Sequence, residues 1–341
     1  MVLMNISRRR EKRKGFLLLF GSRAIGKGRK DSDYDFLHVY GGGDESLNVI
    51  LLSKKYKGRI SVDEIPLEKF TEGVRIGAPD ILIISEQAVA ISGEQNFKLL
   101  MYQNQGVTSL TITLCLEKAD KLIKVAQEYL QEGFLREAAH RLAIAAFWIG
   151  AAYQFLSGKI PSCKHDTFLF LHRNFNVPVS LSNKFSSYEV ADLEEPQKVD
   201  VQFYFKKINE VFRRFYVMAF EEYIRKAKKY LEKAKKHFAS GDPDSSILMA
   251  HSAVELAIKG YLIKKTGKSP LYLLEALSNS LFLSKLKTLL GEDMLNKLVE
   301  LNKMRNAVYH TTYMPSSNDA KFALSVSTKI LEKISNKEAV K

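Results

Sequence analysis

The residues best suited to chemistry are a Gly-Ser pair and, ten residues further on, two aspartates. Gly21 and Ser22 follow the apolar run 16–20, and Asp33 and Asp35 stand beyond the intervening segment. Glycine lets a backbone turn and approach a phosphate, and a serine at a helix start offers a hydroxyl and an amide to an anion. Aspartates at i and i+2 of a strand leave the same face. Since neighbouring carboxylates repel each other unless a cation separates them, we expect Mg²⁺ here.

A third carboxylate should come from a neighbouring strand. The segment 59–65 alternates so that Asp63 lies on its polar face, and Glu64 is the alternative ligand. Three carboxylates would hold metal ions on a triphosphate and activate an attacking hydroxyl, with Asp63 also acting as the base. Lys27, between the Gly-Ser turn and the aspartates, is placed to contact the triphosphate.

The elements that must position these residues differ between the two parts of the chain. Short apolar runs bounded by Gly, Pro, Asp and Ser predict strands near the N-terminus, at 15–20, 36–40, 49–52, 59–65 and 81–84. Beyond about residue 110, apolar residues recur at helical spacing, at 112–131, 135–156, 200–238, 244–265, 285–304 and 318–335. The segment 173–199 reads as irregular. The predicted fold class is α+β, with a small mixed sheet followed by an all-α part.

The helical part contains an apparent repeat. Residues 118–161 and 226–270 both run from Lys-Ala through a glycine turn and an alanine-containing helix to Gly-Lys-x-Pro, at an offset of 108 to 109 residues. The alternative is two unrelated helical hairpins. The duplication predicts three domains, at 1–104, 105–220 and 221–341. His140 and His251, within the alanine-containing helices, are expected to be structural.

A second set of chemical residues stands near the C-terminus. Arg305 and His310 form an Arg-x4-His pattern, and Asn306 follows the arginine. Histidine can move protons between a ribose 2′-hydroxyl and a leaving oxygen, and arginine can stabilise charge on phosphorus. Positions i and i+5 are ~140° apart on an ideal helix, so the two side chains must converge across a ridge or the helix must end between them. The following Thr-Thr-Tyr-Met-Pro segment favours a helix end nearby. The alternative is a helix-terminal histidine that interacts with the dipole.

The pattern Gly-Ser-x10-Asp-x-Asp resembles the minimal nucleotidyltransferases of the polymerase-β superfamily, over roughly residues 15–95. The resemblance implies transfer of a nucleoside monophosphate, AMP from ATP, to a hydroxyl acceptor. Gly21 and Ser22 would hold the phosphates, and the carboxylates of Asp33, Asp35 and Asp63 would bind Mg²⁺.

The Arg-x4-His helix resembles HEPN domains, helical bundles in many of which this pair cleaves RNA without metal. In toxin–antitoxin pairs of these two families, a tyrosine two residues beyond the histidine receives AMP. Thr312 holds that position here, which leaves Tyr309 and Tyr313 as candidate acceptors. The first repeat lacks the motif at 194–201 and resembles a degenerate HEPN bundle, so cleavage would require two chains paired through their second repeats. HEPN-like bundles associate, and we expect a homodimer.

Composition agrees with a nucleotide or RNA partner. The formal charge of +14 favours polyanions. The two cysteines, Cys115 and Cys163, fit a reducing compartment. No run is apolar enough for a bilayer, and the charge order at the start is wrong for a secretory signal, so we expect a cytoplasmic protein without a membrane partner. Two other functions remain open: a HEPN ribonuclease or RNA-binding protein regulated by a nucleotide-binding domain, and a non-enzymatic nucleotide sensor.

Overall fold

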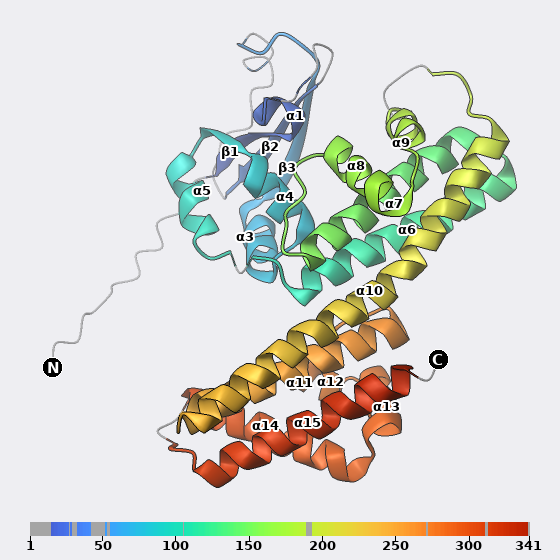
Figure 1. Ribbon diagram of the computed structural model, residues 1–341. Coiled ribbons are helices and arrows are strands. Elements are labelled where there is room, and N and C mark those ends of the chain that lie inside the picture. The colour runs from blue at the N-terminus through green and yellow to red at the C-terminus, as the bar shows by residue number, and fades with distance from the viewer. Residues whose placement is uncertain are drawn as a thin grey trace. The chain divides into compact units, whose positions relative to one another are not determined.

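The computed structural model describes most of the chain, namely residues 15–26, 28, 33–41, 52, 55–104, 106–188, 193–270, 272–310 and 313–339. The described residues group into two compact units. One lies within Met1–Cys115 and Gly150–Asn183, and the other within Leu116–Ile149 and Lys184–Lys341. The fold is α+β, with a small mixed sheet near the N-terminus and a largely helical remainder (Figure 1).

The first unit is built on a four-stranded sheet of order β3-β2-β1-β4. Its strands are β1 (Phe16–Phe20), β2 (Tyr34–Tyr40), β3 (Ile60–Pro66) and β4 (Val89–Ser92). Strand β1 runs antiparallel to β2 and β4, and β2 runs parallel to β3. A parallel pair needs a long crossover, which the segment between Tyr40 and Ile60 supplies.

The two faces of the sheet bury different residues. Phe16, Leu18, Leu37 and Val39 share one face and pack against Phe70, Val74, Ile81, Phe97 and Leu100. These partners come from α3 (Leu67–Ile76), α4 (Pro79–Gln87) and α5 (Glu94–Met101). Leu17, Leu19, Phe36 and Leu52 form the core of the other face. Because successive side chains of a strand point to opposite faces, the position of a polar residue in the strand determines the face on which it lies.

Three of the five predicted strands are confirmed, as β1, β2 and β3. The strand predicted at 81–84 is wrong, because these residues belong to helix α4. Pro79 at the first helical position and Asp80 in the first turn start that helix, and Ile81 and Leu82 are buried. Strand β4 was not predicted. The strand predicted at 49–52 lies outside the described residues except for Leu52.

Two more helices, the second of them only as far as Asn183, complete the first unit and contain segments expected to be irregular. They are α8 (Lys164–Phe175) and α9 (Val179–Ser186). The prediction of an irregular segment at 173–199 is therefore wrong for residues 173–175, 179–186 and 198–199, which are helical. Helix α8 packs closely on the part of α7 (Leu135–Leu156) that belongs to the first unit. A Cβ built on Gly150 of α7 would lie only 2.5 Å from Cγ2 of Thr167 in α8.

The described residues of the second unit form helices and short connections, and the long helices follow the predicted ones closely. Its elements are the main part of α6 (Ser109–Glu132), the first part of α7, α10 (Lys198–Ala239), α11 (Pro243–Thr266), α12 (Leu273–Ser278), α13 (Ser280–Leu290), α14 (Glu292–His310) and α15 (Ser317–Ala339). The single helix predicted at 285–304 is wrong. Gly291, at φ 79°, ends α13 and donates its N–H to the carbonyl of Lys287.

Helix α11 is the core of this unit. It is long and apolar enough to cross a membrane by length and composition, but 67% of its most apolar window is buried inside the protein. Packing against α10, α14 and α15 accounts for that apolar character. Two hydrogen bonds of buried serines join α11 to its neighbours. Ser246 Oγ of α11 donates to the carbonyl of Ala234 in α10, and Ser327 Oγ of α15 donates to the carbonyl of Ala250 in α11.

The boundary predicted at 104/105 falls between α5, which ends at Met101, and α6, which begins at Ser109, whereas the boundary predicted at 220/221 falls inside α10. The 42 residues of α10 continue without a break through position 220 (Figure 1, yellow to orange). Helices α6 and α7, predicted to open one domain at 105–220, are each divided between the two units. The three-domain division and the duplication stay predictions.

Candidate functional site

Gly21 and Asp35 lie in direct contact in the N-terminal sheet. The register places Phe20 opposite Asp35, so the turn after β1 meets the start of β2. Gly21 has φ +74°, and a Cβ built on it would lie 2.6 Å from Oδ2 of Asp35. Both the backbone angle and the nearby carboxylate therefore require glycine. Ser22 follows in α1 (Gly21–Ala24), a single turn that sums few peptide dipoles, so little macrodipole supports the anion site expected there.

The sheet register separates the two candidates for the third carboxylate. Ser61 pairs with Asp35, and Asp63 pairs with Leu37, so Asp63 lies on the face of Asp35 one step along the neighbouring strand. Glu64 lies on the opposite face, where its Oε1 is 3.0 Å from Nδ1 of His38. Asp63 therefore lies on the face required of the third ligand, and Glu64 does not.

The carboxylates influence one another electrostatically. Burial raises the pKa of Asp35, and the negative charges of Asp33 and Asp63 raise it further, against the lowering effect of Lys164. Oδ2 of Asp33 lies 3.8 Å from Nε of Arg59. Negative charge is thus concentrated at one edge of the sheet, where a cation would relieve it.

The carboxylates of Asp33, Asp35 and Asp63 suit a metal ion by the type of their donor atoms. Carboxylate oxygens are the ligands that Mg²⁺ takes in proteins. Among the described residues, however, no group of three or more His, Cys, Asp or Glu side chains lies close enough to hold a metal ion. Binding would have to draw the carboxylates of Asp33, Asp35 and Asp63 together.

Cations also reach this edge of the sheet. Lys164, the first residue of α8, acts on Asp35 from far along the chain, and no sequence pattern connects the two. The guanidinium carbon of Arg23 lies 4.7 Å from the ring centroid of Tyr34. Lys27, the predicted triphosphate contact, lies outside the described residues.

In the C-terminal part, Tyr309 lies between the two residues of the Arg-x4-His motif. The guanidinium carbon of Arg305 is 4.7 Å from the centroid of the Tyr309 ring. The centroid of the His310 ring is 5.6 Å from the same point. Helix α14 reaches His310, which is exposed. Arg305 and His310, five positions apart on α14, therefore both lie close to the Tyr309 ring.

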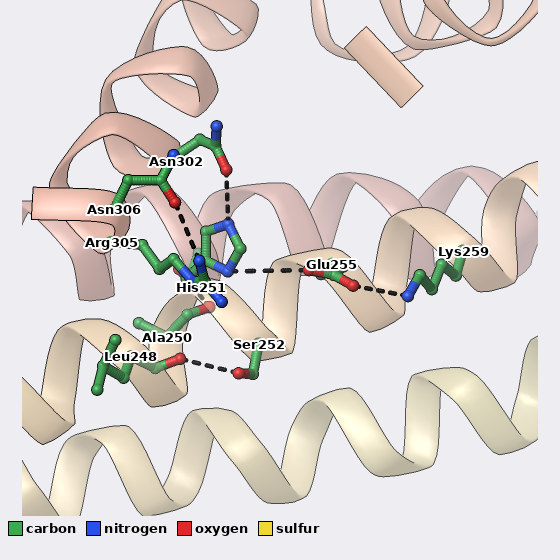
Figure 2. Close-up of polar contacts among 10 residues, drawn as sticks. Leu248, Ala250, His251, Ser252, Glu255, Lys259, Asn302, Arg305 and Asn306 are labelled. Atoms are coloured by element: carbon green, nitrogen blue, oxygen red, sulfur yellow. Dashed lines mark hydrogen bonds and ion pairs between the residues drawn. The ribbon is translucent and has the colours of Figure 1, made fainter. Parts of the chain in front are cut away.

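A polar network connects this arginine's helix to α11. Nε2 of His251 lies 3.0 Å from Oδ1 of Asn302, and Nη1 of Arg305 donates to Oδ1 of Asn306 over 3.0 Å (Figure 2). Burial lowers the pKa of His251, and the positive charges of Arg305 and Lys259 lower it further, against Asn302 and Glu255. The buried histidine is therefore held neutral beside the arginine.

Helix α11 contributes a ladder of polar residues at four-residue spacing. Nζ of Lys259 donates to Oε1 of Glu255 over 2.6 Å, and Oε2 of Glu255 lies 4.0 Å from Nδ1 of His251 (Figure 2). Sequence reasoning missed Glu255 and Lys259 and treated His251 as structural. The signal that would have found them is the His-x3-Glu-x3-Lys spacing on an otherwise apolar helix.

The two candidate acceptor tyrosines differ in their surroundings. The Tyr313 hydroxyl donates to Oδ2 of Asp319 over 2.9 Å, and Asp319 also accepts from the N–H and the hydroxyl of Ser316. Ser316 and Asp319 cap the start of α15, so Tyr313 belongs to that cap. Tyr309 is 63% exposed. Thr312 lies outside the described residues.

Residues 220–337 match the family model of the HEPN domain. A HEPN domain is therefore found in this chain, and it contains α11, α14, Arg305 and His310. A search of the curated proteins and a search of the solved structures found no match. The small mixed sheet near the N-terminus is compatible with a nucleotidyltransferase fold.

Proposed function

We propose that the HEPN domain acts on RNA, and that Arg305 and His310 cleave it without a metal ion. The observation that carries this proposal is the position of the pair. Both residues fall within the matched HEPN segment, and both contact one exposed ring at the end of α14.

The chemistry asked of each residue is simple. His310 takes the proton of a ribose 2′-hydroxyl, whose oxygen then attacks the adjacent phosphorus. The O2′–P bond forms, the P–O5′ bond breaks, and the 5′-oxygen takes up a proton, so the products are a 2′,3′-cyclic phosphate and a 5′-hydroxyl. Arg305 stabilises the extra negative charge on the phosphoryl oxygens. The buried network of His251 and Asn302 keeps the helix that bears Arg305 in place.

The chain has one Arg-x4-His pattern, which bears on its assembly. If a cleft lined by two motifs is required, two copies of the chain must supply it, and the active form is a homodimer paired through residues 221–341. Mixing Arg305→Ala and His310→Ala chains tests this. Recovery of activity in the mixture would show that the copies share a site.

The decisive experiment is cleavage of labelled RNA by the full chain in the presence of EDTA. His310→Ala should slow cleavage by about 10²–10⁴-fold and Arg305→Ala by about 10²–10³-fold. His237→Ala is the matched control, because His237 also lies in the last turn of a helix in the same unit. Cleavage that survives in His310→Ala would overturn the assignment.

We propose, as a second activity, that the N-terminal domain transfers a nucleoside monophosphate, AMP from ATP, to a hydroxyl. The contact between Gly21 and Asp35 and the shared face of Asp35 and Asp63 support it. Gly21 and Ser22 would contact the phosphates, Asp33 and Asp35 would hold Mg²⁺ together with Asp63, and Asp63 would accept the proton of the attacking hydroxyl. When bound, Mg²⁺ supplies charge neutralisation on the triphosphate.

Intact mass spectrometry after incubation with ATP and Mg²⁺ tests this second activity. A nucleotidyl adduct on the wild type but not on Asp33→Ala/Asp35→Ala would support it, and an adduct mapped to Tyr309 or Tyr313 would identify a toxin–antitoxin-like link to the HEPN domain. ATP binding without an adduct, and without transfer to added hydroxyl compounds, would favour a nucleotide sensor.

A further inference from the structure

Tyr309, near the end of α14, has no role in the cleavage chemistry proposed above. Tyr309 is 63% exposed, although it stands beside the two residues proposed to cleave RNA. Other tyrosines of the chain are also exposed, among them Tyr272, and Tyr309 differs from Tyr272 in its contacts with Arg305 and His310. Here the ring is covered in part by the Arg305 guanidinium, 4.7 Å from its centroid, and most of its surface faces solvent.

We propose that Tyr309 is a stacking platform for an unpaired RNA base next to the phosphate that is cut, so that the HEPN site selects single-stranded RNA. The inference rests on the proposed ribonuclease function and adds its substrate class. Bases stack on exposed aromatic rings only when they are unpaired and splayed out of a helix.

Distances and charge favour a nucleotide over a protein side chain as the occupant. The ring has His310 at 5.6 Å and the Arg305 guanidinium at 4.7 Å, so a base on Tyr309 would bring its own phosphate within reach of both. Residues 301–310 include Lys303 and Arg305 but no aspartate or glutamate. An arginine against an exposed aromatic ring is an arrangement that binds single-stranded nucleic acid.

The i and i+4 spacing of Arg305 and Tyr309 explains why the platform is rigid. Both side chains leave the same face of α14, and their cation–π contact limits rotation of the ring. The network of His251 and Asn302 fixes the same helix one turn earlier. The platform is therefore formed before RNA arrives, which lowers the entropy lost on binding.

The test measures binding without cleavage. The probes are a fluorescein-labelled eight-nucleotide 2′-O-methyl RNA, which lacks the attacking hydroxyl, and the same backbone with abasic sites. The readout is fluorescence anisotropy with the full chain. The wild type should bind the base-containing probe more tightly than the abasic probe, and Tyr309→Ala should lose about 5- to 150-fold in affinity for the base-containing probe only. Tyr309→Phe should keep the preference.

Tyr272→Ala is the matched control, because Tyr272 is 62% exposed in the same unit. It should bind both probes as the wild type does. A Tyr309→Ala chain that still prefers the base-containing probe would overturn the stacking proposal while leaving RNA cleavage intact. A wild type that binds neither probe would overturn the RNA function and the stacking proposal together.

Discussion

His251 of α11 and Asn302 of α14 are joined by a hydrogen bond of 3.0 Å between Nε2 and Oδ1. Asn302 lies three residues before Arg305, so the buried histidine fixes the turn of helix that carries the arginine. A residue with 4% exposure thus holds the orientation of a residue proposed to meet RNA. The burial of this histidine makes the domain sensitive to acid, because burial lowers the pKa of the His251 side chain.

The folded chain should lose stability as the pH falls below 6.5, the ordinary pKa of histidine. Burial lowers the pKa of His251 in the folded state, so the unfolded chain binds the proton more tightly. The contribution is complete above pH 6.5 and is lost as the pH falls through the lowered pKa. The hydrogen bond with Asn302 and the charge of Glu255 oppose this shift, and the charges of Arg305 and Lys259 add to it.

Urea unfolding at several pH values measures this effect. His251→Gln should lose less stability between pH 7 and pH 5 than the wild type, although it starts from a lower value. The exposed His165→Gln should follow the wild-type curve. Equal pH dependence in wild type and His251→Gln would contradict the prediction.

The ion pair of Glu255 and Lys259 should matter more than an exposed pair. Their side chains are 24% and 12% exposed, so loss of one partner leaves a poorly solvated charge. We expect Lys259→Met to cost about 1–3 kcal/mol in the free energy of unfolding, allowing for partial solvent screening.

Lys235→Met is the control, since Lys235 pairs with Glu232 over 2.8 Å on an exposed face. Its cost should stay below about 0.5 kcal/mol. Chemical denaturation of both variants gives the comparison, and equal costs would argue against a role for burial.

Gly21→Ala should destabilise the N-terminal unit by about 1–3 kcal/mol, because the new methyl group would meet Asp35 and the backbone angle is unfavourable for alanine. Gly26→Ala separates the two causes. Gly26 has φ +71°, but a Cβ there would meet nothing within 4 Å. Thermal unfolding should show a clearly larger loss for Gly21→Ala, and similar losses would mean that the carboxylate moves away at no cost.

Asp35→Asn should raise the melting temperature of the ligand-free protein at pH 7. A carboxyl with a raised pKa contributes stability that is complete below its ordinary value of 3.8 and is lost as the pH rises through the raised value. Asparagine does not ionise, so that loss disappears. The gain should shrink as the pH is lowered towards 3.8, and the exposed Glu86→Gln should show none.

Magnesium and ATP should reverse the order of the melting temperatures of the wild type and Asp35→Asn. At a ligand concentration of 100 times Kd, the wild type should gain about 2.7 kcal/mol and Asp35→Asn should gain little. Differential scanning fluorimetry with and without Mg²⁺·ATP measures both effects. A lower melting temperature for ligand-free Asp35→Asn at neutral pH would show that Asp35 is there for structure.

The parts of the fold that follow a simple period were predictable. Alternation along β3 placed Asp63 and Glu64 on opposite faces, and the register confirms that division. Long helices such as α7 and α11 were found within a few residues of their ends. In each case one face is buried over many residues, so the pattern is repeated often enough to read.

The errors come from short apolar runs and from contacts distant in sequence. Residues 81–84 are apolar without interruption, which suits a buried strand, and the helix-start signals at Pro79 and Asp80 were decisive instead. Leucines at helical spacing on both sides of Gly291 concealed the break between α13 and α14. Neither the electrostatic effect of Lys164 on Asp35 nor the hydrogen bond between His251 and Asn302 leaves any local signal in the sequence, since these residues are far apart along the chain.

The unbroken length of α10 has a consequence for how the helical part comes apart. Its 42 residues form a rod of about 63 Å. Tyr204, early in this rod, stacks edge-on against Phe185, while Phe220 and Ile224 further along belong to the core that contains α11. Because one continuous helix packs in both regions, we expect the helices around Phe185 and Tyr204 and the HEPN core to unfold in one cooperative transition. A domain cut at residue 220 should show no separate melting.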